Sequence, residues 1–268
     1  MEATLDRAVA ALDAGGVSYA LMGGLASAAM GRARHTHDVD LFVTPDDADR
    51  ALDRLAAAGF RTERTDPRWL YKAYWSETLV DVIFTSKGGV LFDDEMRAHL
   101  RRIQVRGRDV WTLSPEDMLV IKALASAEHV PRHWHDALAL IAAGGLEWPY
   151  LVKRARPHAP RVLSLLLYAL SDGLPVPLEP VQDLFEIATA QLPVTPDVEA
   201  RHHLAAHIRQ ALATDPRVNE PEVTVIVDDD VVVRGQVATA SRRQAIEVVL
   251  RELVGEERLR NEVEVLDP

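Results

Sequence analysis

The chain has 268 residues, of which 48% are hydrophobic and 26% are charged. This composition is typical of a folded globular protein and excludes a chain that is disordered throughout. The formal net charge of −11 argues against a protein that binds nucleic acid over its whole surface, and a chain with no cysteine has neither disulfides nor thiolate metal sites. Acidic residues stand where a signal peptide would be basic, and no apolar run is long enough to cross a bilayer. We therefore expect a cytoplasmic protein.

Helices and strands alternate over the first part of the sequence. The hydrophobic periodicity and the turn residues predict the following elements in chain order: a helix at 3–14, a strand at 17–22, a helix at 25–32, a strand at 38–43, a helix at 48–59, and strands at 69–75, 78–84, 101–107 and 109–113. This order favours an α+β fold built around one mixed β-sheet.

The later part of the chain becomes helical and then changes character again. Residues 114–171 predict a run of helices, of which the first begins at Ser114-Pro115 with a capping residue and a proline. Residues 172–196 are rich in proline and predict a linker that contains a short helix. The remainder predicts a helix, two strands about an acidic turn, another helix and a last strand. We expect four parts: a core at 1–113, a helical subdomain at 114–171, a linker at 172–196 and a small α/β domain at 197–268.

Three aspartates suggest a metal site at the sheet. In the strand "DVDLFV", alternation places Asp38 and Asp40 on one face, and Asp81 interrupts the apolar strand "LVDVIF". Carboxylates this close repel one another unless a cation neutralises them, and hard oxygen ligands favour Mg²⁺ or Mn²⁺. Gly23 and Gly24 lie between a strand and a helix, where backbone amides can hold phosphate oxygens. Together these features indicate phosphoryl or nucleotidyl transfer.

Other interpretations of the same segment are weaker. His35 and His37 could bind zinc together with the aspartates, but their side chains alternate away from Asp38. Phosphatases with a D-x-D strand have an apolar segment before the first aspartate, whereas "RARHTH" stands there in this chain. Arginines between 97 and 108, and basic residues between 153 and 161, predict solvated surfaces that could also receive a phosphate-rich acceptor such as RNA.

The order of these residues resembles a known superfamily. Gly23-Gly24, Gly31, Arg34-x-Thr36-x-Asp38-x-Asp40-Leu41 and Asp81 resemble the nucleotidyltransferases with a polymerase-β-type core, and most closely the bacterial proteins of the abortive-infection toxin type. The resemblance covers about residues 3–160. It implies that Asp38, Asp40 and Asp81 are catalytic and bind divalent metal, and that the nucleotide is bound by the following residues: Gly23, Gly24, Arg34, Thr36, Lys122 and Asp136. One departure is His133, which stands where relatives often have an acid.

The resemblance also implies a reaction. A nucleoside monophosphate would pass from a nucleoside triphosphate to an acceptor, which could be RNA or protein, with Mg²⁺ or Mn²⁺ as cofactor. The alternative is a catalytically idle fold of this type that acts as a nucleotide sensor or interaction scaffold.

The C-terminal part resembles a second family. The pattern of residues 197–268, with Gly235 after the second strand and Asn261 before the last valines, is similar to the BON domain. Such domains carry no catalytic residues. The resemblance implies that this domain docks a protein partner or a membrane, although the acidic turn at residues 228–230 would disfavour anionic lipid.

Overall fold

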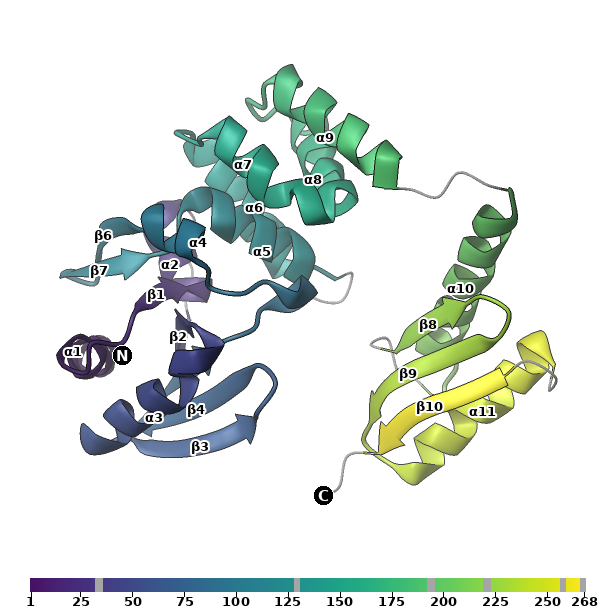
Figure 1. Ribbon diagram of the computed structural model, residues 1–268, viewed down its shortest axis with the longest axis horizontal. Helices are drawn as coiled ribbons and strands as arrows, with labels where there is room; N and C mark the ends of the chain where they lie inside the picture. Colours follow the sequence, from purple (N-terminus) through teal and green to yellow (C-terminus); the bar gives the residue numbers. More distant parts are fainter. Residues whose placement is uncertain (32–35, 128–130, 192–195, 219–222, 256–258, 266–268) are drawn as a thin grey trace. The chain divides into compact units, whose positions relative to one another are not determined.

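The computed structural model describes residues 1–31, 36–127, 131–191, 196–218, 223–255 and 259–265. In the helix at residues 196–214, side chains are described only from residue 200 onward. The chain divides into two compact units, Met1–Gln191 and Leu192–Pro268. Each unit has a hydrophobic core of its own. Figure 1 shows the elements of both units. Within the described residues, no helix is both long enough and apolar enough to span a membrane.

A seven-stranded mixed sheet forms the centre of the first unit. Its strands lie in the order β3-β4-β5-β2-β1-β7-β6. The strands are β1 (Tyr19–Met22), β2 (Asp38–Val43), β3 (Arg61–Asp66), β4 (Leu70–Trp75), β5 (Thr78–Ile83), β6 (Arg101–Val105) and β7 (Arg108–Thr112). The β2–β5 and β1–β7 pairs are parallel and the other pairs are antiparallel. The predicted α+β fold with a mixed sheet is thus confirmed.

Helices cover the sheet and continue into a helical half. They are α1 (Glu2–Ala14), α2 (Gly23–Met30), α3 (Ala48–Ala57), α4 (Asp94–Ala98), α5 (Pro115–Ala125), α6 (Arg132–Ala143), α7 (Trp148–Ala155), α8 (Ala159–Ser171) and α9 (Leu178–Gln191), with short 3₁₀ turns at Pro45–Asp47, Lys87–Gly89 and Arg156–His158. α1 packs on α3, and α3 lies against β3, β4 and β5. Figure 1 shows α5 to α9 gathered on one side of the sheet. The predicted start of α5 is present, since the Ser114 hydroxyl accepts a hydrogen bond from the Asp117 amide.

The segment predicted as a linker contains more structure than a short helix. α9 is 14 residues long and packs against α7 and α8 within the first unit. Its Pro180 lies in the first helical turn, where proline costs no intrahelical hydrogen bond. The proline content of residues 172–196 therefore marks a helix start as well as a connection. The four-part division at residues 113, 171 and 196 stays a prediction.

The second unit consists of two helices and a three-stranded sheet. The helices are α10 (Pro196–Thr214) and α11 (Ala240–Val254), and the strands β8 (Thr224–Val227), β9 (Val231–Val237) and β10 (Leu259–Val265). β9 is the central strand; it pairs antiparallel with β8 and parallel with β10. The predicted order of helix, strand pair, helix and strand matches this arrangement.

Candidate nucleotidyl-transfer site

Strands β2 and β5 bring the three aspartates together. The two strands are parallel neighbours, and Asp40 is directly opposite Asp81 in their register. Asp38 lies two residues before Asp40 and therefore on the same face, while Val39 and Leu41 point into the core and are fully buried. One carboxylate oxygen from each of Asp38, Asp40 and Asp81 lies within 4.8 Å of the others. The predicted convergence of acids from two strands is present.

The proximity of these acids perturbs their proton affinity. Burial, reinforced by the negative charges of Asp38 and Asp81, raises the pKa of Asp40 from 3.8 to about 7. Burial also raises the pKa of Asp81, although the ammonium of Lys72 works in the opposite direction. A cation shared by the three acids would relieve this repulsion. Three hard carboxylate ligands form a donor set that suits Mg²⁺ or Mn²⁺.

The two glycines support Asp40 directly. Gly23 has a φ of +64°, and a Cβ at this position would lie 1.8 Å from Oδ2 of Asp40. The amide of Gly24, at the start of α2, donates a hydrogen bond to the same oxygen at 3.3 Å. A residue with a side chain at position 23 would therefore collide with the carboxylate. The glycines were predicted to bind the triphosphate; in this structure they hold the backbone close to an acid of the cluster.

The other two acids have partners of different kinds. The hydroxyl of Thr36, a residue that is almost fully buried, donates a hydrogen bond to Oδ1 of Asp38. Lys72 on β4 is directly opposite Asp81, and its Nζ lies 2.9 Å from Oδ1 of that residue. The sequence analysis missed Lys72. Its signal was a single lysine in the otherwise apolar strand "WLYKAYW", but only the pairing of β4 with β5 connects it with Asp81.

The helical half contributes a buried ion pair. Nζ of Lys122 on α5 lies 3.0 Å from Oδ2 of Asp136 on α6, and the two side chains are 3% and 0% exposed. Lys122 is near enough to Asp40 to lower its pKa, although less than burial and the two acids raise it. The structure thus brings the predicted Lys122 and Asp136 to each other and places Lys122 in the field of the cluster. Arg34 lies outside the described residues.

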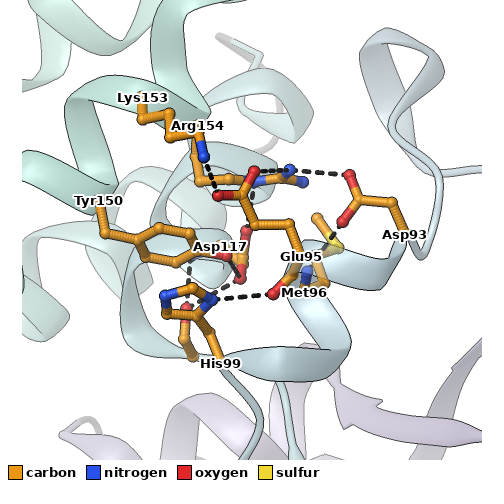
Figure 2. A network of polar contacts seen from close by, with 9 residues as sticks. Asp93, Glu95, Met96, His99, Asp117, Tyr150, Lys153 and Arg154 are labelled. Carbon is orange, nitrogen blue, oxygen red and sulfur yellow. Dashed lines mark hydrogen bonds and ion pairs between the residues drawn. The ribbon is translucent and has the colours of Figure 1, made fainter.

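A second polar cluster, which we call the helix-junction network, joins α4, α5 and α7 (Figure 2). Asp117 is fully buried and accepts hydrogen bonds from Ser114, Tyr150 and Arg154 at 2.8–2.9 Å. Arg154 also donates to Asp93 at 2.7 Å. The outer members of the network are Glu95 and Lys153, which form an ion pair, and His99, which stacks on Tyr150 with 3.7 Å between ring centroids.

The sequence analysis did not predict the helix-junction network. Asp117 lies in the first turn of the helix predicted from Ser114, and Arg154 lies in the basic group between residues 153 and 161, and neither was assigned a buried role. Every partner of the Asp117 carboxylate in this network is a hydrogen-bond donor, and the network ties α4 to α5 and α7. Its geometry fits a structural role.

Comparisons with solved structures return matches of low sequence identity. The lincosamide antibiotic adenylyltransferase LnuA, in its lincomycin-bound form, is 15% identical with a TM-score of 0.41, and the match covers 54% of this chain and 98% of that one. ANT(2")-Ia in complex with adenylyl-2"-tobramycin is 18% identical with a TM-score of 0.42, over 63% and 95% of the two chains. An antigenic nucleotidyltransferase-like protein from Paracoccidioides brasiliensis is 19% identical with a TM-score of 0.38, over 60% and 90%. A search of curated proteins finds no match.

Sequence patterns of two families match the chain. Residues 201–267 match the BON domain, which confirms the resemblance of the second unit. Residues 1–171, well over half of the chain and the whole of the sheet that carries the aspartates, match the family described as "Uncharacterised nucleotidyltransferase". The protein therefore belongs to this nucleotidyltransferase family, and its second unit is a BON domain.

Proposed function

We propose that the protein is a metal-dependent nucleotidyltransferase that moves a nucleoside monophosphate from a nucleoside triphosphate to a hydroxyl or phosphate of an acceptor. The observation that carries this proposal is the group of three carboxylates from β2 and β5, with one oxygen from each within 4.8 Å of the others. Structural acids of the same chain are surrounded by donors, as Asp117 is. The acids of this group instead face one another, which favours a bound cation.

The residues of the site take the following roles in this proposal. Asp38, Asp40 and Asp81 hold Mg²⁺ or Mn²⁺. The bound metal would lower the pKa of the attacking hydroxyl and stabilise the charge of the leaving pyrophosphate. Gly23 and Gly24 keep the start of α2 close to Asp40, with the amides of the first helical turn available to phosphate oxygens. Thr36 orients Asp38, and Lys122 with Asp136 supports the nucleotide side. Arg34 is proposed from the sequence pattern alone.

The overall reaction balances without a further reactant. An oxygen of the acceptor forms a bond with the α-phosphorus of the nucleoside triphosphate, and the bond from that phosphorus to the bridging oxygen breaks. Pyrophosphate leaves with its electron pair, and an acceptor hydroxyl gives up its proton. We propose RNA or protein as the acceptor; the exposed Lys153, Arg156 and Arg161 of the helical half could contact the phosphates of an RNA. We further propose that the BON domain docks a partner protein or a membrane, and that the protein acts in the cytoplasm.

Labelled transfer tests the proposal. Purified protein is incubated with each α-labelled nucleoside triphosphate, Mg²⁺ or Mn²⁺, and total cell RNA or total cell protein. We expect metal-dependent label in one acceptor pool. Asp40→Asn should reduce transfer by about 10²–10³-fold or more, because the metal loses one ligand. The matched control is Asp46→Asn, at an exposed aspartate in the turn after the same strand, which should transfer at the parent rate.

Two outcomes would contradict the proposal. If Asp40→Asn is folded by circular dichroism and transfers label as fast as the parent, the aspartate cluster is not the active site. Metal-dependent binding of a triphosphate with no transfer to any acceptor would instead favour the sensor interpretation.

A further inference from the structure

Among the residues that the structure describes, the three acids of the proposed metal site accept hydrogen bonds from three different kinds of donor. Asp38 accepts from the hydroxyl of Thr36, and Asp40 accepts from the backbone amide of Gly24. Asp81 accepts from the ammonium of Lys72 at 2.9 Å. The first two donors are neutral and the third is a full positive charge.

This difference matters when a divalent cation arrives. A neutral donor polarises a carboxylate and remains compatible with a metal on the other oxygen. An ammonium beside the same carboxylate repels a divalent ion, and the repulsion is strong at a partly buried site, where the effective dielectric is low. The metal and Lys72 therefore compete for Asp81.

Lys72 has the freedom to leave. Its side chain is 23% exposed, and that of Asp81 is 16% exposed, so the pair lies at the edge of the solvent. On the other side of Lys72, Glu63 of β3 is directly opposite it in the β3–β4 register and is exposed, so an alternative carboxylate lies across the adjacent strand. Lys122 offers a contrast, because it is 3% exposed and paired with a fully buried Asp136. Of these two lysines, only Lys72 can move at little cost.

We propose that Lys72 is a displaceable counter-ion of the metal site, which neutralises Asp81 in the metal-free protein and turns toward Glu63 and solvent when a divalent ion binds. This inference rests on the proposed function, because it requires that the three aspartates bind metal. Lys72 is then a positioning residue for Asp81: it holds the carboxylate in place before the metal arrives. It also sets the metal affinity below the value that three free carboxylates would give.

Metal binding, measured without any nucleotide or acceptor, tests this role. Binding of Mn²⁺ is followed by the loss of the free-ion signal in electron paramagnetic resonance, for the full chain and its variants. We expect Lys72→Met to bind Mn²⁺ about tenfold more tightly than the parent, because the competing charge is gone. Lys72→Arg keeps the charge and should bind close to the parent value.

A matched control uses another lysine of an ion pair. Lys153 pairs with Glu95 in the helix-junction network, and Lys153→Met should leave Mn²⁺ affinity unchanged. Circular dichroism checks that each variant is folded. If Lys72→Met is not folded, Lys72→Gln, which keeps a polar group beside Asp81, replaces it with the same expectation.

The outcomes separate this inference from the proposed function. If the parent binds Mn²⁺, Asp40→Asn loses it, and the uncharged Lys72 variant binds no more tightly than the parent, the role of Lys72 is overturned and the metal site stands. If the parent binds no Mn²⁺, or binds it as tightly as Asp40→Asn does, the proposed function fails and the inference fails with it.

Discussion

Two groups of acids in the first unit differ in how their negative charges are balanced. In the helix-junction network, Asp93, Glu95 and Asp117 are joined by two cationic side chains, those of Lys153 and Arg154. In the cluster of Asp38, Asp40 and Asp81, the ion pair that the described residues show is the one between Lys72 and Asp81. The network comes close to neutralising itself, whereas the metal site keeps an excess of negative charge.

The hydrogen bonds of the two groups differ in the same way. The carboxylate of Asp117 accepts from a serine, a tyrosine and an arginine, and these donors offset part of the cost of its burial, although burial still raises its pKa. Asp40 accepts from one amide at 3.3 Å, and burial with two neighbouring acids raises its pKa to about 7. The network is complete in the folded chain, whereas the proposed function has a cation complete the aspartate cluster. The comparison predicts that loss of a charge destabilises the folded protein in the network, whereas loss of the Asp40 charge stabilises the metal-free protein.

The largest effect is expected at Arg154. Its guanidinium bridges Asp93 and the fully buried Asp117, so Arg154→Met leaves a buried carboxylate without its cation. We expect the free energy of unfolding to fall by about 3–5 kcal/mol, the range for a buried pair that loses one partner. Urea denaturation measures this change. Arg156→Met, at an exposed arginine two residues later, is the control and should change stability by less than about 0.5 kcal/mol. Equal effects of the two substitutions would show that the network does not stabilise the helical half.

The sequence predicted the convergence of Asp38, Asp40 and Asp81 but not the helix-junction network, because the first follows from a local pattern. Asp38 and Asp40 share a face because strand alternation has a period of two, and the mixed sheet follows from the order of elements. The helix-junction network joins residues that are far apart in sequence, and Asp93 and Arg154 are separated by 61 positions. No periodic pattern relates such residues, so only the packing of α4 and α7 brings them together.

Several elements were missed for similar physical reasons. β3, "RTERTD", has no apolar alternation because it is an edge strand with mostly exposed residues. α4 has only five residues, too few for a helical period to appear. α9 was predicted only as a short helix within a linker, because the prolines of its segment indicated a connection. Lys72 was missed because its contact with Asp81 depends on the register of β4 and β5, which cannot be read from the sequence.

A glycine substitution tests how closely the metal site is built on its backbone. Gly23 and Gly16 have nearly the same positive φ, +64° and +61°, but a Cβ at Gly23 meets Asp40, whereas a Cβ at Gly16 meets nothing within 4 Å. Gly16→Ala should cost about 1 kcal/mol of stability through backbone strain alone. Gly23→Ala should cost about 2–3 kcal/mol, because the carboxylate must also move. Thermal unfolding compares the two variants. The proposed function adds that Gly23→Ala loses Mn²⁺ affinity and Gly16→Ala keeps it; equal behaviour of the two would contradict the close approach of Asp40.

The smallest effect concerns pH and follows from the excess of negative charge in the metal site. In metal-free protein, the pKa of Asp40 is raised from 3.8 to about 7, so between these values the folded state binds more protons at this residue than the unfolded state does. The free energy of unfolding must then decrease as pH rises through this window and level off above it. Since Asp40 keeps some exposure, we expect about 2 kcal/mol, roughly half of what the full shift would give.

Asp40→Asn isolates this contribution, because all other titrating groups are shared with the parent. With EDTA present, the stability of the variant relative to the parent should rise by about 2 kcal/mol from pH 4 to pH 8, measured by urea denaturation at each pH. Asp117→Asn, at the buried acid of the helix-junction network, should instead be less stable than the parent at pH 8, because Arg154 then loses its charged partner. If the difference in free energy of unfolding between Asp40→Asn and the parent stays constant across this range, the pKa of Asp40 is not raised by burial and its acidic neighbours. The contrast between a self-sufficient network and a site that needs a cation would then not hold.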